Sequence, residues 1–95
     1  MLYIVIEKAI EEFKAENDRE AMKLLYNSNT QLNAVIKDHR VYDHITELYY
    51  SDSYNVENMI RYLEAVAKYE KCYEAMKIAK IAFEDTAESI FGTEW

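Results

Sequence analysis

The sequence predicts an all-α fold, a small helical bundle with one long C-terminal helix. The chain has no proline and a single glycine, Gly92, so two-residue hairpin turns have little to build on. Apolar residues recur at three- and four-residue steps over two long stretches, which is typical of amphipathic helices. About half of the 95 residues are apolar, enough for one core. We therefore expect a single helical domain over residues 1–95.

The first sixteen residues allow two structures. Residues 3–6 are rich in β-branched side chains and would suit a strand. That strand would belong to an α+β alternative, with an N-terminal β-hairpin at about 2–15 followed by helices. Residues 7–16 are strong helix formers, and Ile6, Ala9, Ile10 and Phe13 share one helical face. A helix is favoured, because the hairpin's turn near Lys8 would have poor turn chemistry.

Two further helices are predicted before residue 50. Asn17, followed three residues later by Glu20, resembles a capping box that would start a helix running to about Tyr26. That helix would bury Ala21, Leu24 and Leu25. After Thr30, helical spacing predicts one continuous helix of about five turns. Its apolar face would consist of Leu32, Val35, Ile36, Tyr42, Ile45, Leu48 and Tyr49.

The long helix is expected at about 54–84, because apolar residues from Val56 to Phe83 recur at helical spacing without a breaker. At about 1.5 Å per residue it would be about 45 Å long. A compact globule of this size should be only about 32 Å across. The helix must therefore kink, or project and pair with another copy. A homo-oligomer is favoured.

The charge of the chain limits its partners. The formal net charge is −7, so we expect no direct binding to nucleic acid or to an anionic membrane. Basic residues do cluster late in the chain, but glutamates interleave with them. Acidic residues without such compensation stand near the start, and an acidic surface attracts basic proteins. These residues are Glu7, Glu11, Glu12, Glu16, Asp18 and Glu20.

The sequence favours a cytoplasmic location. No apolar run approaches the roughly 18 residues that a membrane span requires. The lone cysteine, Cys72, cannot form an internal disulfide, which fits a reducing compartment. A small thiol in or near the core is the usual role of such a residue.

Catalytic or metal-binding patterns are weak. His39, Asp43 and Glu47 stand at i, i+4 and i+8, so one helix would place them on one face, where they could hold a metal or transfer a proton. The same pattern is typical of a solvated helix face, and diagnostic metal spacings are missing. Cys72 lies one turn after Lys68, but neither histidine is near it in sequence. We expect no enzyme activity, no metal and no cofactor.

The nine tyrosines carry the functional prediction. Tyr42, Tyr49 and Tyr73 fall on the apolar stripes and are expected in the core. A second set lies off or at the edge of those stripes and could form an interface patch with neighbouring cations. These candidate binding residues are Tyr50, Tyr54, Tyr62, Tyr69, Arg61 and Lys68.

The resulting hypothesis is a non-enzymatic, acidic protein-interaction module whose partner carries a basic surface. One form of such a module is an inhibitor of a nucleic-acid-binding or defence protein, of the kind that phages and mobile elements carry. The alternative is an oligomeric helical bundle that binds an anionic small molecule such as a nucleotide. In that case Tyr62, Tyr69, Arg61 and Lys68 would line the site.

Overall fold

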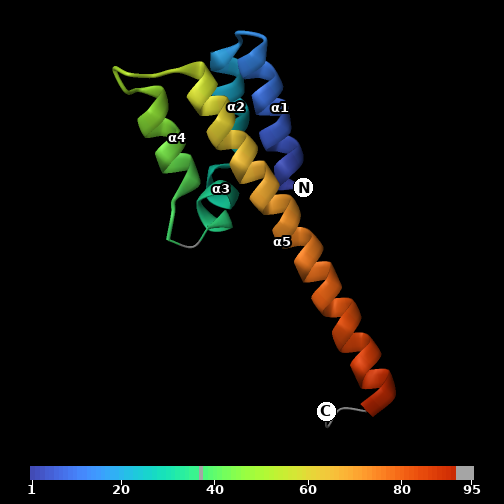
Figure 1. Cartoon of the computed structure of the whole chain (residues 1–95). Helices are drawn as coiled ribbons and strands as arrows, with labels where there is room; N and C mark the ends of the chain where they lie inside the picture. Colours follow the sequence, from blue (N-terminus) through green and yellow to red (C-terminus); the bar gives the residue numbers. More distant parts are fainter. Residues whose placement is uncertain (37, 92–95) are drawn as a thin grey trace.

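The described residues form helices, with one isolated β-bridge between Ile36 and His39 (Figure 1). The computed structural model describes the backbone of residues 1–36 and 38–91 and the side chains of residues 1–36 and 38–76. Over these residues there are five helices and no strand, which confirms the all-α prediction and makes the N-terminal hairpin wrong. The helices are α1 (Leu2–Lys14), α2 (Asp18–Asn27), α3 (Asn29–Val35), α4 (Val41–Tyr49) and α5 (Val56–Phe91).

Helix α1 packs along the first half of α5 and runs in the opposite direction, while α2 packs against α1 (Figure 1). The predicted face of α1 is buried, and Ile6, Ala9 and Phe13 are almost completely excluded from solvent. Complete burial of one large apolar side chain contributes about 1.5–3 kcal/mol. The core draws on all five helices: Ile6, Ala9, Ile10, Phe13, Ala21, Leu25, Leu32, Val41, Ile45, Met59, Leu63, Val66 and Ala67.

The junction of α1 and α2 confirms the predicted helix start but not its capping box. Helix α2 begins at Asp18, directly after Asn17, as expected. The Asn17 side chain makes no cap hydrogen bond to α2. Instead its Nδ2 donates to Glu12 Oε2 at 3.1 Å, and its backbone N–H donates to the Glu12 carbonyl at 2.8 Å. Glu16 makes the reversal possible by adopting a left-handed backbone with φ of 65°.

The single helix predicted between Leu32 and Tyr49 is wrong, because the chain breaks after α3 and turns back into α4. Ile36 is extended, and the His39 N–H donates to the Ile36 carbonyl at 3.0 Å. Folding back brings Leu32, Val41 and Ile45 into one core, each fully buried. A straight helix could not place both of its ends against that core.

Asn33 stabilises the return. Its Oδ1 accepts hydrogen bonds from the backbone N–H groups of Tyr42 at 2.8 Å and Asp43 at 3.3 Å. The first turn of α4 is therefore capped by a residue of α3 that lies nine positions before Tyr42 in the sequence.

Helix α5 confirms the long C-terminal helix predicted at about 54–84 and continues to Phe91. It runs past the other four helices (Figure 1), and the principal-axis extents of the molecule are 58 × 25 × 20 Å. Ala79 and Phe83, which the apolar series includes, lie beyond the described side chains. Across the described residues, no helix is both long enough and apolar enough to span a membrane.

Candidate functional site

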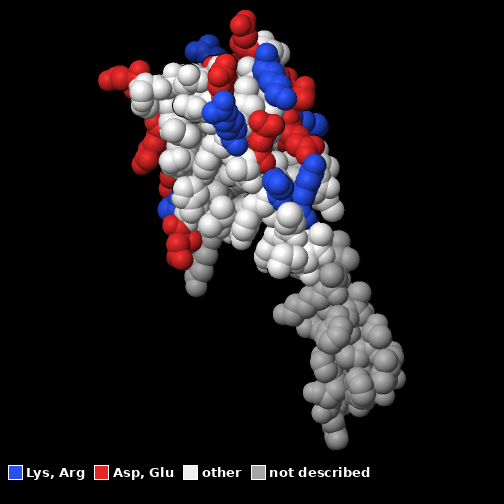
Figure 2. All heavy atoms as spheres, viewed as in Figure 1, with Lys and Arg blue, Asp and Glu red and all other residues white. Residues whose placement is uncertain are grey.

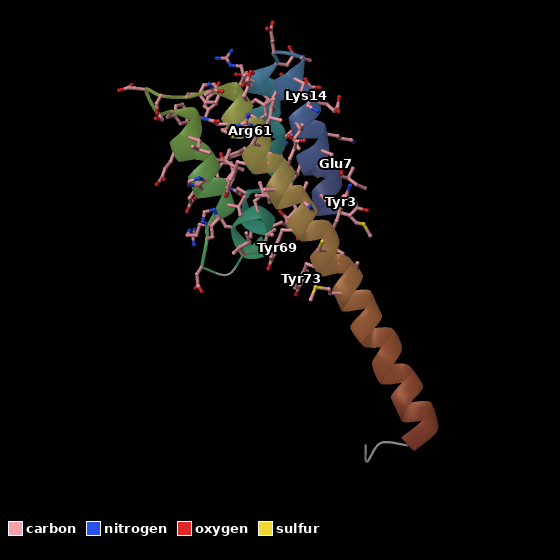
Figure 3. The ribbon with its side chains drawn as sticks, in the orientation of Figure 1. Tyr3, Glu7, Lys14, Arg61, Tyr69 and Tyr73 are labelled. Carbon is pink, nitrogen blue, oxygen red and sulfur yellow. The ribbon has the colours of Figure 1, made fainter. Side chains whose placement is uncertain are left out.

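The four tyrosines of the predicted patch divide between the connection from α4 to α5, which holds Tyr50 and Tyr54, and α5, which holds Tyr62 and Tyr69. Tyr50 is 76% exposed in the connection between α4 and α5, where its ring meets that of Tyr49 at 5.0 Å. Tyr69 lies four turns into α5, near α3 (Figure 3). Tyr54 and Tyr62 are half-buried and pack against the core. The structure therefore gathers Tyr50 and Tyr54 around Tyr49, and it does not join all four rings in one patch.

Tyr54 connects the segment before α5 to the start of α2. Its hydroxyl donates to Asp18 Oδ2 at 2.8 Å, and its ring meets Tyr49 at 5.3 Å. Burial of the ring, together with the neighbouring Asp18 carboxylate, raises the pKa of Tyr54 well above its ordinary value. A hydroxyl held in this way joins two elements and leaves little of the side chain for a partner.

Tyr62 is held by two histidines. Its hydroxyl lies 2.6 Å from His39 Nε2, and its ring centroid is 4.7 Å from that of His44. Burial raises the pKa of Tyr62 to about 12. The arrangement packs α5 against α4 and against the turn before it.

The remaining predicted tyrosine, Tyr69, forms a pair with Tyr73. Their rings stack at 6.5 Å with an interplanar angle of 12°, and they are 44% and 50% exposed. Tyr73 was expected in the core, and that expectation is wrong. The four-residue spacing of the two tyrosines places them on one side of α5, so it is the signal that could have identified this pair.

The pair borders a groove of about 530 Å³ between α1, α3 and α5 (Figure 3). We call it the tyrosine groove. Apolar atoms come from the start of α1 and from α3, and two carboxylates come from α5. The full lining is Leu2, Gln31, Ala34, Val35, Tyr69, Glu70, Tyr73 and Glu74. Its volume is in the usual range for ligand sites.

Charge distinguishes this groove from a second hollow between α1 and α5. The second hollow has a volume of about 350 Å³ and is lined by three lysines and three glutamates besides Ile10 and Ala67. Figure 2 shows basic and acidic side chains interleaved over α1 and α5, while the surface over α3 is largely uncharged. Among the lining residues of the tyrosine groove, the charged ones are both glutamates. The groove is therefore the more apolar and the more acidic of the two sites.

The predicted cations Arg61 and Lys68 are both exposed on α5. Lys68 lines the balanced hollow beside Glu7, Glu11 and Glu64. Glu7 was expected to lack compensation, but the structure pairs it with Lys71 Nζ at 2.5 Å. The Glu7 carboxylate raises the pKa of Lys71 through this hydrogen bond. Sequence spacing could not reveal this pair, because it joins two helices far apart in the chain.

The polar residues considered for chemistry do not form a site. His39 lies in the turn before α4 and its ring faces Tyr62, whereas Asp43 and Glu47 are exposed on α4. Their expected common helix face is therefore wrong. Within residues 1–36 and 38–76, no group of three His, Cys, Asp or Glu side chains could hold a metal ion. Cys72 is exposed, so its expected place in the core is wrong as well.

Comparison with protein-family models, with curated proteins and with solved structures finds no match for this chain.

Proposed function

We propose that this protein is a non-enzymatic protein-interaction module that binds a segment of a partner protein in the tyrosine groove. The observation that carries the proposal is the stacked pair of Tyr69 and Tyr73, half-exposed at the border of an apolar groove. Tyrosine is enriched at protein interfaces because a rigid ring supplies contact area at a small cost in conformational entropy.

The lining of the groove indicates the chemistry of the partner. Leu2, Ala34 and Val35 provide an apolar floor for a large apolar side chain. Glu74 contributes a carboxylate on the α5 side, which favours a lysine or arginine next to that apolar residue. The formal net charge of −7 favours the approach of the same kind of partner over a longer range. An inhibitor that covers the basic site of a nucleic-acid-binding protein is one member of this class.

The alternative ligand, a nucleotide or another anionic small molecule, has less support. Tyr62 is engaged with His39 and His44, so its ring is not free to stack on a base. Lys68 shares its hollow with three glutamates and two further lysines, so the hollow carries no net positive charge to attract an anion.

The test is to titrate the labelled full chain with a short amphipathic peptide of leucine and lysine and to follow amide and side-chain resonances. We expect the largest shifts at Leu2, Val35, Tyr69 and Tyr73. A peptide of leucine and glutamate of the same length should cause no comparable change. Absence of shifts with the lysine peptide, or shifts centred elsewhere, would overturn the proposal.

Substitutions provide a second measurement. Tyr69→Ala with Tyr73→Ala should weaken peptide binding about tenfold or more, the equivalent of about 1.4 kcal/mol. Tyr26→Ala is the matched control, because Tyr26 is 62% exposed on α2, away from the groove. Equal losses in the two variants would show that the groove has no special role.

A further inference from the structure

The tyrosine groove lies between two helices that each present a row of side chains to it. On α3 the lining residues Gln31 and Val35 are four positions apart, and Ala34 lies beside them. On α5 the lining residues Tyr69 and Tyr73 have the same spacing (Figure 3). Rows at four-residue spacing are the ridges by which helices pack, because the space beside one ridge accepts a ridge of another helix. The shape of the groove therefore matches a helix that lies along it.

An extended segment suits this groove less well than a helix does. An extended peptide gains its hydrogen bonds by adding a strand to the edge of a sheet, and the described residues contain no strand to receive it. Its backbone N–H and C=O groups would face Leu2, Ala34 and Val35, whose side chains form no hydrogen bonds. A helix pairs its backbone groups internally. The apolar floor therefore favours an occupant whose backbone hydrogen bonds are already made.

Exposed side chains on α5 indicate the length of the contact. Met76 follows Tyr69 at the seven-residue spacing that keeps both on one side of the helix, and it is 69% exposed. At about 1.5 Å per residue, the row from Tyr69 through Tyr73 to Met76 is about 10 Å long, or roughly two turns. An occupant of about two to three turns would cover this row. A helix that short is marginal in water, so the partner segment becomes helical as it binds.

Charge defines the flank of that helix. Glu74 follows Tyr73 in the lining and is half-buried, and no described residue of the lining is basic. A lysine or arginine on the occupant would meet the Glu74 carboxylate, while its apolar stem lies along the ring of Tyr73. On the basis of the protein-binding function above, we propose that the partner segment in the tyrosine groove is an amphipathic α-helix. Its apolar residues face the groove at three- and four-residue steps, and a basic residue lies beside Glu74.

Proline placement in a synthetic peptide tests the helix. The parent peptide has about twelve residues, roughly three turns, with leucines at helical spacing among alanines and lysines. One variant carries proline at a central, solvent-facing position, where proline breaks a helix. The matched variant has the same composition but carries proline at the first helical position, where it is tolerated.

We expect the central proline to raise the dissociation constant for the full chain at least about tenfold relative to the matched variant, which corresponds to about 1.4 kcal/mol. The Cα chemical shifts of the isotope-labelled parent peptide should become helical in the complex. Equal affinity of the two proline peptides, or extended shifts in the complex, would overturn the helical occupant and leave the proposed function standing. No binding of the parent peptide would overturn the proposed function, and the helical occupant with it.

Ala34 provides the corresponding test on the protein. Its side chain is exposed on α3, so Ala34→Phe fills the floor of the groove without entering the core. Ala15→Phe is the matched control, because Ala15 is exposed directly after α1, at the opposite end of that helix from Leu2. We expect Ala34→Phe to weaken binding of the parent peptide at least about tenfold and Ala15→Phe to leave it unchanged. Equal affinities of the two variants would show that no helix enters between α3 and α5, and would overturn the proposal.

Discussion

The hydroxyl of Tyr62 lies 2.6 Å from Nε2 of His39, which joins α5 to the turn that separates α3 from α4. The two rings meet edge to face at 5.8 Å, and His44 closes the cluster from α4. Helical spacing alone places Tyr62 at the edge of an apolar stripe, but in the structure its side chain packs between α5 and α4. The same contact provides a direct test of the packing of α4 against α5.

Alkaline pH should destabilise the fold through Tyr62. Burial raises its pKa from 10.0 to about 12, so the folded state favours the neutral phenol more strongly than the unfolded state does. This stabilisation is fully present below about pH 10 and is lost as the pH rises through about 12. Urea unfolding at a series of pH values should show the decline. Tyr62→Phe should reduce its slope, and an unchanged slope would contradict the burial argument.

Loss of the Tyr54 hydroxyl should weaken the link between α2 and the segment before α5. Tyr54→Phe removes the 2.8 Å hydrogen bond to Asp18 and should lower the free energy of unfolding by about 1.5–3 kcal/mol, the usual range for a charged acceptor. Chemical denaturation of Tyr54→Phe, Asp18→Ala and the double variant measures the coupling. Additive effects of the two substitutions would show that the hydrogen bond contributes nothing in solution.

Removal of the Asn33 amide should destabilise the start of α4. Asn33→Ala deletes the acceptor for the Tyr42 and Asp43 N–H groups, and loss of a helix cap costs about 0.5–2 kcal/mol. Asn58→Ala, at an exposed position on α5, is the matched control. Thermal unfolding should separate the two variants, with Asn33→Ala the less stable. Equal stabilities would mean that the turn between α3 and α4 holds without the cap.

Glycine should be tolerated at position 16 better than alanine. Glu16 has φ of 65°, a left-handed conformation that costs roughly 1–2 kcal/mol for a residue with a Cβ atom. Glu16→Gly should therefore be more stable than Glu16→Ala by about 1 kcal/mol. Both variants lose the same negative charge relative to wild type, so the difference between their free energies of unfolding does not contain the effect of that charge. If alanine is the more stable residue, the left-handed turn between α1 and α2 does not persist in solution.

Local pattern predicted most of the helices. Ile6, Ala9, Ile10 and Phe13 are buried as their spacing required, and α5 follows the long apolar series without a proline or glycine to interrupt it. Such predictions succeed because helical periodicity is a property of neighbouring residues. The candidate site was predicted only in part, since Tyr69 is half-exposed at the groove whereas Tyr73 was expected in the core.

The sequence by itself determined that the chain is helical, acidic and rich in tyrosine, because composition and spacing are local quantities. Only the tertiary structure decided where the chain turns back after Val35 and which tyrosines become available to a partner. The break before α4 depends on an amide from α3, and the positions of Tyr54 and Tyr62 depend on Asp18 and His39. Each of these partners is distant in sequence, so no local pattern contains the contact.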